Sequence, residues 1–358
     1  MVKKILFIAF MTLFITVAGY LSGKGAPAYA GEQGHYSPMP IGVRDTVMPP
    51  KGFYLCAYDM YYGSDTFRDS NGIKLESISA GRTAATDISI GGQSVPVTLT
   101  GNLAAEVDME ASTFAQLVPV MWAPGVKLLG ADYAFLAIPS WGYTRINVEA
   151  NVTGAGTISV GNQTRTVTVN RKVEVTQECT GLGDFYVQPV WLDWRGKHYD
   201  LGISYGVWCP TGYYNEENLA NVGLGFWTQQ VQGTACYYLF GSHATALLVR
   251  PTYEWHSNKI GEDVQPGQNI TLEYGLSHFI NPRAEVAVLA YSEWQLNKDR
   301  GDDAINANTL DRVSGIGAQV TCWAVQHKCA IIGKFNQELG SRDRLEGTAW
   351  SLNLTWVF

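Results

Sequence analysis

The chain has 358 residues, only 16% of which are charged, and its formal net charge is −7 at pH 7. Soluble domains carry roughly 25% charged residues. The acidic balance argues against nucleic acid as a partner, because binding phosphates needs concentrated positive charge. Beyond residue 30, no stretch reaches the ~18 apolar residues of a transmembrane helix. Two classes of protein are left: a secreted β-sandwich, and a membrane barrel with apolar residues at alternate positions.

The first 30 residues have the features of a secretory signal peptide. Lys3 and Lys4 precede an apolar run over 5–17, and an A-x-A cleavage site follows at 28–30. Cleavage removes Lys3, Lys4 and Lys24 and no acid, so the formal charge of −7 becomes −10. A barrel lumen this acidic would disfavour anionic solutes unless basic groups are concentrated locally.

Residues 31–50 come between this site and the first expected strand. They contain Pro38, Pro40, Pro49 and Pro50. Two interpretations are open for this periplasmic segment: a hatch that plugs the barrel lumen, or a loose tail.

Residues 51–358 are predicted to form an all-β, transmembrane antiparallel barrel. From about residue 181, apolar residues occupy every second position over stretches of ~10 residues, as in 199–207, 247–255 and 270–276. Short links alternate with long ones, which is typical of periplasmic turns and long extracellular loops. With the N-terminus in the periplasm, this parity predicts about 12 strands, with 10 or 14 as alternatives.

The last expected strand ends at Phe358. Trp350, Leu352, Leu354 and Trp356 alternate with other residues before this terminal aromatic, a pattern that resembles the signal read by the barrel-assembly machinery. We expect this strand to run toward the periplasm and to close the barrel against the first strand near 53–62.

A repeated pattern lies within the two longest predicted loops, 64–103 and 150–180. Residues 88–93 read ISIGGQ and residues 158–163 read ISVGNQ, and Val-Thr follows each at the same distance. Gly-rich turns between Thr/Val strands favour hairpins. We predict that each segment forms a β-hairpin standing above the membrane, although a chance similarity is the alternative.

The cysteines allow two interpretations in an exported protein. Disulfides are permitted there, and six cysteines allow fifteen pairings; Cys322 and Cys329 flank a short turn and could pair. Alternatively, the cysteines are small apolar residues facing lipid. They are Cys56, Cys179, Cys209, Cys236, Cys322 and Cys329.

Motifs for catalysis are weak. Residues 202–206 match G-x-S-x-G, but Ser204 lies inside an alternating strand, without the strand–turn–helix setting of a nucleophile elbow. His256 is expected near the outer rim on the polar face. No spacing of ligands suits zinc, and no P-loop is present. We therefore predict no catalytic residues, no metal and no cofactor.

The polar face of the strands supplies the candidate site. Charged and aromatic side chains that project inward by alternation either line a solute path or form a structural ion-pair network. The lumen-lining candidates are Arg250, Glu254, Glu273, Glu285, Tyr291, Glu293, Lys334 and Glu338.

Several short motifs occur in one order: 183–185 (GDF), 189–191 (PVW), 210–213 (PTGY), 225–227 (GFW) and 265–267 (QPG). This order resembles the exported family called putative meta-pathway of phenol degradation, over most of the mature chain. The resemblance implies an outer-membrane barrel, similar to uptake channels for fatty acids and aromatic hydrocarbons. It does not imply catalysis, and it supplies no binding residue. The six cysteines and an inserted β-rich stretch near 157–178 depart from the family pattern.

The leading hypothesis is a passive outer-membrane channel for small hydrophobic or aromatic compounds. Its expected partners are that solute, outer-membrane lipid and lipopolysaccharide, and the barrel-assembly machinery. The alternatives are a structural or surface-interaction protein that works through the 64–103 and 150–180 hairpins, and an outer-membrane hydrolase.

Overall fold

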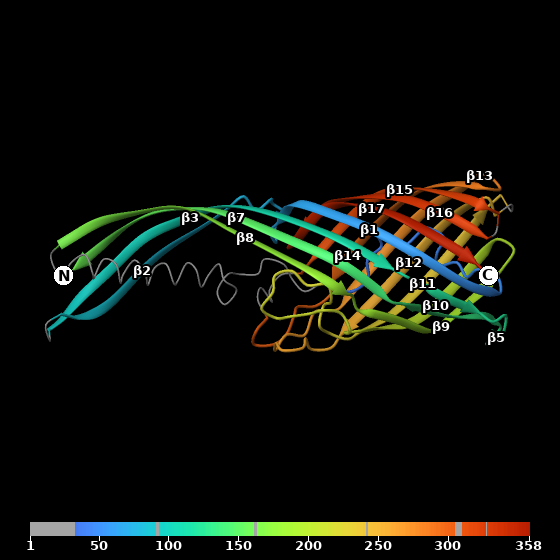
Figure 1. Ribbon diagram of the computed structural model, residues 1–358, viewed down its shortest axis with the longest axis horizontal. Coiled ribbons are helices and arrows are strands. Elements are labelled where there is room, and N and C mark those ends of the chain that lie inside the picture. Colours follow the sequence, from blue (N-terminus) through green and yellow to red (C-terminus); the bar gives the residue numbers. More distant parts are fainter. Residues whose placement is uncertain (1–32, 91–92, 161–162, 241–242, 305–309, 327) are drawn as a thin grey trace.

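The computed structural model describes residues 33–90, 93–160, 163–240, 243–304, 310–326 and 328–358, so the predicted signal peptide at 1–30 lies outside the described residues. These residues are all-β and form one connected sheet of 17 strands (Figure 1). The strands are β1 (Gly52–Arg68), β2 (Ser77–Ile90), β3 (Gln93–Leu117), β4 (Val120–Ala123), β5 (Lys127–Leu128), β6 (Ala131–Ile138), β7 (Ser140–Val160), β8 (Gln163–Leu182), β9 (Phe185–Arg195), β10 (Tyr199–Cys209), β11 (Thr228–Leu239), β12 (Thr245–His256), β13 (Asn269–Asn281), β14 (Ala284–Gln295), β15 (Arg312–Val325), β16 (Cys329–Arg342) and β17 (Arg344–Val357).

The sheet closes into a barrel through an antiparallel pairing of β1 with β17, from Tyr54 opposite Val357 to Arg68 opposite Arg344. Strands β10 to β17 pair in chain order. The rest of the wall consists of β1 and three interrupted strands, β3–β4, β6–β7 and β8–β9. Together these make the 12 barrel strands that loop parity predicted, and the closing strand pair is the one expected.

The three interruptions lie next to one another in the wall. Strand β4 follows β3 after Val118 and Pro119, β7 follows β6 after Pro139, and β9 follows β8 after Gly183 and Asp184. Hydrogen bonds join these points across the strands: Val118 N donates to Pro139 O (3.0 Å), and Gly183 N donates to Ser140 O (3.0 Å). Because proline has no N–H, a ladder cannot run unbroken through it.

Both predicted hairpins are present. In β2–β3 the register pairs Ile90 with Gln93, and in β7–β8 it pairs Val160 with Gln163, so the repeated sequence pattern marks the two hairpin ends. Strands β3 and β7 also pair with each other as far as Val97 opposite Val160, which joins the hairpins into one four-stranded sheet. This outer sheet projects far beyond one end of the barrel (Figure 1). The segments are therefore mostly strand rather than irregular loop.

The remaining connections sort by length as predicted, with the one-residue link at Asp343 between β16 and β17 as the short exception. Long ones, 210–227, 257–268 and 296–311, lie at the end of the barrel that carries the outer sheet, and short ones such as 196–198 and 282–283 lie at the other end. No helix of the described residues is long and apolar enough to cross a membrane.

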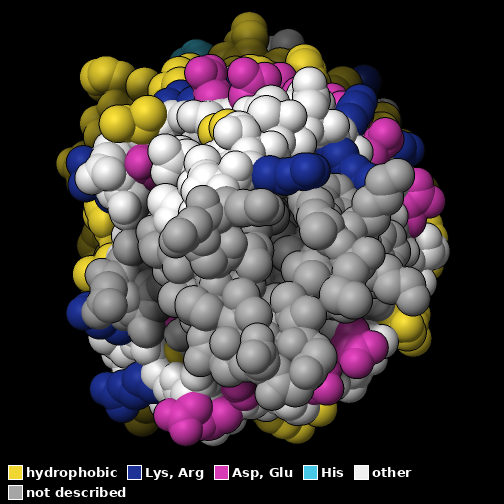
Figure 2. Space-filling view, turned by 90° about the vertical axis from the view of Figure 1, so that its left-hand side faces the viewer, with side chains coloured by type: hydrophobic (Ala, Val, Ile, Leu, Met, Phe, Trp, Pro, Cys, Tyr) yellow, Lys and Arg dark blue, Asp and Glu magenta, His cyan; other side chains and the backbone are white. Residues whose placement is uncertain are grey.

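The outside of the barrel wall is apolar and the inside is polar. On β12, Leu247 and Val249 are exposed, whereas Arg250, Thr252 and Glu254 are buried inside. The same alternation continues to Leu352 and Leu354 on β17. In an end-on view from the side of the outer sheet, hydrophobic side chains gather at the periphery (Figure 2). This outer surface suits lipid rather than water.

All six cysteines are free thiols, so the Cys322–Cys329 disulfide is not formed; the register places Cys322 opposite Ile331. The expectation that the cysteines face lipid is wrong for at least two of them. Cys236 is buried inside the barrel in one cluster with Val43, and Cys56 lines an internal cavity. Cys322 is exposed.

Candidate functional site

Residues 33–50 lie inside the barrel, where side chains of the wall bind their backbone. Pro38 and Pro40 lack N–H groups, so this segment cannot join the sheet as a regular strand. Instead, five successive carbonyl oxygens, those of residues 38–42, accept hydrogen bonds from buried side chains. The donors are Lys334 to Pro38 (2.6 Å) and Ile41 (2.7 Å), Asn336 to Met39 (3.2 Å), Asn353 to Pro40 (2.6 Å) and Arg250 to Gly42 (3.4 Å). We call residues 33–50 the inner segment.

Two of the predicted lumen residues, Arg250 and Glu273, form a buried ion pair beneath this segment, with Arg250 Nε 2.8 Å from Glu273 Oε1. The Tyr36 hydroxyl donates to the same carboxylate. Glu254 accepts a hydrogen bond from the backbone N–H of Tyr36 (3.0 Å). These wall residues therefore contact the inner segment.

The other predicted lumen residues are also buried and engaged. Glu285 pairs with Arg44 of the inner segment (2.6 Å). Glu293 pairs with Arg344 (2.9 Å). Tyr291 packs against Met39, and its hydroxyl lies 3.5 Å from Glu338. All eight candidates thus face the barrel interior, and they split between contacts with the inner segment and contacts within the wall.

The outer end of the inner segment is held by His35. Its Nε2 lies 2.9 Å from Asp184 Oδ2 and its Nδ1 lies 2.7 Å from Thr228 Oγ1. The imidazole stacks on Trp208 and meets Phe226 edge-on. Asp184 also accepts the backbone N–H groups of Gly212 and Leu224 in the 210–227 loop (2.8 Å each). His35 therefore links the inner segment to a strand interruption and to an outer loop.

Burial lowers the pKa of His35 below its ordinary value and outweighs the neighbouring Asp184. Burial alone would raise the pKa of Asp184, but the hydrogen bonds from His35 and the two loop N–H groups hold that pKa below its usual range. The contact therefore pairs an imidazole that resists protonation with a carboxylate that stays ionised.

At the opposite end, the inner segment is held by Arg195, which donates to the carbonyls of Met48 (2.6 Å) and Pro49 (2.8 Å). Met48 packs against Ala134 and Trp191 of the wall.

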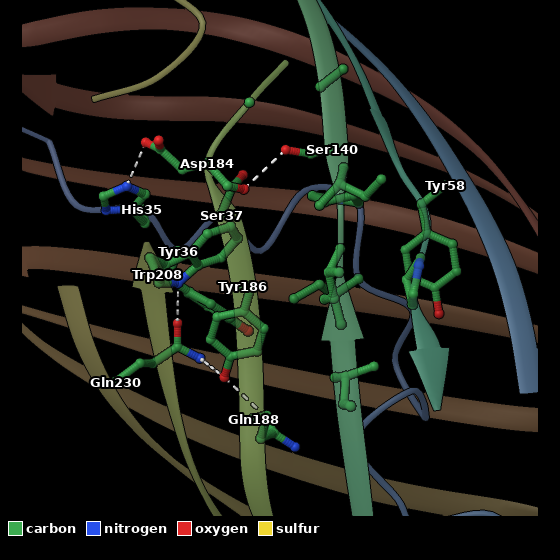
Figure 3. A pocket seen from close by; sticks show the side chains of 18 of the residues that line it. His35, Tyr36, Ser37, Tyr58, Ser140, Asp184, Tyr186, Gln188, Trp208 and Gln230 are labelled. Carbon is green, nitrogen blue, oxygen red and sulfur yellow. Dashed lines mark hydrogen bonds and ion pairs between the residues drawn. The ribbon is translucent and has the colours of Figure 1, made fainter. Parts of the chain in front are cut away.

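A cavity of about 340 Å³ lies between the inner segment and the interrupted part of the wall (Figure 3). Its apolar lining comes from the inner segment (Ile41), from β3, β4 and β6 (Leu117, Met121, Leu136, Ile138) and from β10 (Trp208). The inner segment takes most of its polar contacts from β12 to β17. The cavity lies on its other side, next to the interrupted strands.

One edge of the cavity is polar but uncharged. Trp208 Nε1 donates to Gln230 Oε1 (2.9 Å), Gln230 Nε2 donates to the Tyr186 hydroxyl (3.2 Å), and that hydroxyl donates to Gln188 Oε1 (3.0 Å) (Figure 3). Aromatic and aliphatic walls with a few convergent polar groups are typical of small-molecule sites.

The wall of the cavity continues into the outer sheet. Thr113 of β3 and Thr144 of β7 line the cavity and pair with each other. Because successive strand residues alternate between faces, the same face carries apolar residues farther out, while the opposite face is charged and exposed. The apolar residues are Val107, Met109, Ala111, Ile146, Val148, Ala150, Val173 and Val175; the charged ones include Glu106, Asp108, Glu110, Glu174 and Glu178.

The residues singled out for hydrolysis have other contacts. Ser204 is buried and lines the cavity. His256 Nδ1 shares a hydrogen bond with Thr228 Oγ1 (2.7 Å). In the described part of the chain, no group of three or more His, Cys, Asp or Glu side chains could hold a metal ion.

Sequence reasoning missed the cavity and its principal residues, such as Leu117, Leu136, Ser140 and Gln188. They lie in β3, β6, β7 and β9, where the interruptions break the simple alternation. No signal in the sequence pairs His35 with Asp184.

A closed antiparallel barrel with an apolar outer surface and a polar, filled interior defines an outer-membrane β-barrel of bacteria. Residues 83–354 match the family described as "Putative MetA-pathway of phenol degradation", and the chain belongs to this family. Among curated proteins, none matches the chain in sequence.

A solved structure has the same fold. The COG4313 outer membrane channel from Pseudomonas putida F1 superposes with a TM-score of 0.56 at 12% identity, covering 91% of this chain and 100% of that one. A FadL homologue from Pseudomonas aeruginosa gives a TM-score of 0.34 at 11% identity, covering 95% of this chain and 97% of that one. The first of these two proteins is an outer-membrane channel.

Proposed function

We propose that this protein is a passive channel for small hydrophobic or aromatic compounds. The observation that carries the proposal is the cavity between the inner segment and the wall, which is lined by Leu117, Met121, Leu136 and Ile138. Lipopolysaccharide slows apolar solutes, so a protein path with apolar and aromatic contacts would help them cross the outer membrane.

The route begins at the outer sheet, whose apolar face leads into the cavity along β3 and β7. From there the solute needs a way past the inner segment. That segment is held by hydrogen bonds and ion pairs and contains no disulfide, so its displacement needs no covalent step. In this proposal, residues 33–50 act as the hatch and the wall residues Arg250 and Lys334 hold it closed.

A cavity-filling variant tests this function. In Ala115→Trp the indole would occupy the cavity, because Ala115 lines it. We expect entry of radiolabelled phenol into cells to fall several-fold toward the rate of cells without the protein. The matched control is Val288→Trp, which places the same side chain on the exposed lipid face of β14. Equal entry for the wild type, both variants and cells without the protein would contradict the proposal.

A second candidate is surface interaction through the outer sheet, favoured by the charged, exposed face with Glu106, Asp108 and Glu110. Shortening both hairpins separates the two functions. If the sheet serves only surface binding, that binding disappears while phenol entry is unchanged.

A further inference from the structure

Among the described residues, those that line the cavity include no lysine and no arginine. Its acidic groups are Asp45 and Asp184. Both carboxylates already accept hydrogen bonds, Asp45 from Tyr58 (2.8 Å) and from Gly42 N (2.7 Å), and Asp184 from His35 and the 210–227 loop. The fixed charge at the cavity is therefore negative.

The described basic groups of the barrel interior lie outside this lining and are already bound. Arg250 pairs with Glu273, Arg344 with Glu293 and Arg44 with Glu285, while Lys334 and Arg195 donate to backbone carbonyls. An anionic solute entering the cavity would lose its water without gaining a cation. An unpaired buried charge is far more costly than a buried dipole that finds a hydrogen bond.

Uncharged hydrogen-bonding groups are available instead. The chain of hydrogen bonds from Trp208 through Gln230 and Tyr186 ends on Gln188 Oε1. The Nε2 amide group of Gln188 donates to no other described residue, and Gln188 lines the cavity. It can donate to one hydroxyl or carbonyl oxygen of a solute whose apolar part lies against Leu117 and Leu136.

We propose that the cavity selects uncharged aromatic or aliphatic compounds bearing one hydrogen-bonding group, such as phenols, alcohols or amides, and discriminates against carboxylates. This inference rests on the proposed function, because it names the solutes that the same cavity takes.

The test compares two ligands of nearly identical shape, 2-naphthamide and 2-naphthoate, which differ mainly in charge at pH 7.5. Binding to the purified full-length barrel in detergent would be followed by calorimetry. We expect the amide to bind at least ~10-fold more tightly. Equal binding, or tighter binding of naphthoate, would overturn the inference and leave the proposed channel function intact. Failure of both to bind would overturn the inference and the cavity-based function together.

A variant pair locates the selectivity. Gln188→Lys places a cation at the polar edge and should raise naphthoate affinity relative to naphthamide, whereas Gln188→Met, of similar size but uncharged, should not. Naphthoate binding unaffected by Gln188→Lys in a folded barrel would overturn the role of this edge. The wild-type comparison does not depend on either variant folding.

Discussion

The ammonium group of Lys334 lies 2.6 Å from the carbonyl oxygen of Pro38, 296 positions earlier in the chain, and 2.7 Å from that of Ile41. One buried ammonium group of β16 thus binds the backbone at both ends of the bend at 38–41 in the inner segment. Proline-rich backbone offers carbonyls without matching N–H groups, and side chains from β12, β16 and β17 bind them.

Replacing Lys334 should release this segment without unfolding the barrel. In Lys334→Met, two buried carbonyls lose their donor, at about 1–3 kcal/mol each. We expect larger single-channel conductance and protease cleavage within 33–50, while the folded barrel keeps its electrophoretic mobility. Lys328→Met, at an exposed lysine on the neighbouring turn, is the control. Unchanged conductance and cleavage would show that Lys334 does not hold the hatch.

Changes at the buried pair Arg250–Glu273 should be strongly non-additive in a double-mutant cycle, with the single Arg250 change costing more stability than the double change. Arg250→Met leaves the Glu273 carboxylate buried without its cation and should lower the free energy of unfolding by about 3–5 kcal/mol. Arg250→Met combined with Glu273→Leu should recover part of that loss. Stability is measured as a urea titration, in which unfolding is followed by the loss of the electrophoretic band of the folded barrel. If the double variant lost more free energy of unfolding than the two single variants lose together, this expectation would be wrong.

Acidic pH should loosen the outer end of the inner segment. The docked His35 has a pKa below its free value of about 6.5, so the undocked state binds more protons as the pH falls through that value. Docking is therefore fully stable above about pH 6.5 and weakens below it. The lowered pKa of Asp184 also weakens docking, at still lower pH, because the undocked carboxylate takes up a proton more readily than the docked one. His35 also faces Glu254 and, through Thr228, His256.

Conductance measured between pH 7.5 and 5 checks this dependence. It should rise on acidification in the wild type, and the rise should be smaller in His35→Gln, which keeps a hydrogen-bonding side chain that does not titrate. A rise of the same size in both proteins would assign the effect to other groups.

The outer sheet should be dispensable for barrel folding but not for solute capture. Ala80 pairs with Leu103 and Gly156 pairs with Val167, so replacing 81–102 and 157–166 by Asn-Gly turns shortens both hairpins at paired positions. We expect unchanged heat-modifiable mobility and a several-fold slower phenol entry at low concentration. Normal entry combined with lost surface binding would favour the surface-interaction alternative.

The barrel was predictable because its wall repeats one simple rule. Lipid outside and polar groups inside impose period 2 on β10 to β17, and the terminal pattern up to Phe358 identifies the closing strand. The hairpins were also predictable, because turn residues between Thr/Val-rich strands are a local signal. Each of these features is set by residues close together in the chain.

The cavity was not predictable because it depends on long-range contacts. Pro119, Pro139 and Asp184 interrupt neighbouring strands, and only the register brings these points together. The inner segment has no periodicity of its own, since its position is set by donors such as Lys334 and Asn353 about 300 residues away. Alternation identified the inward-facing side chains, but not the segment that many of them bind.

The most direct test of the central claim is a crystal structure of the protein soaked in 4-bromophenol, located by the anomalous signal of bromine. We expect a bromine peak inside the cavity, beside Leu117 and Leu136, and the loss of that peak in Ala115→Trp. Bromine found only on the outer surface of the barrel, with the cavity empty, would contradict it.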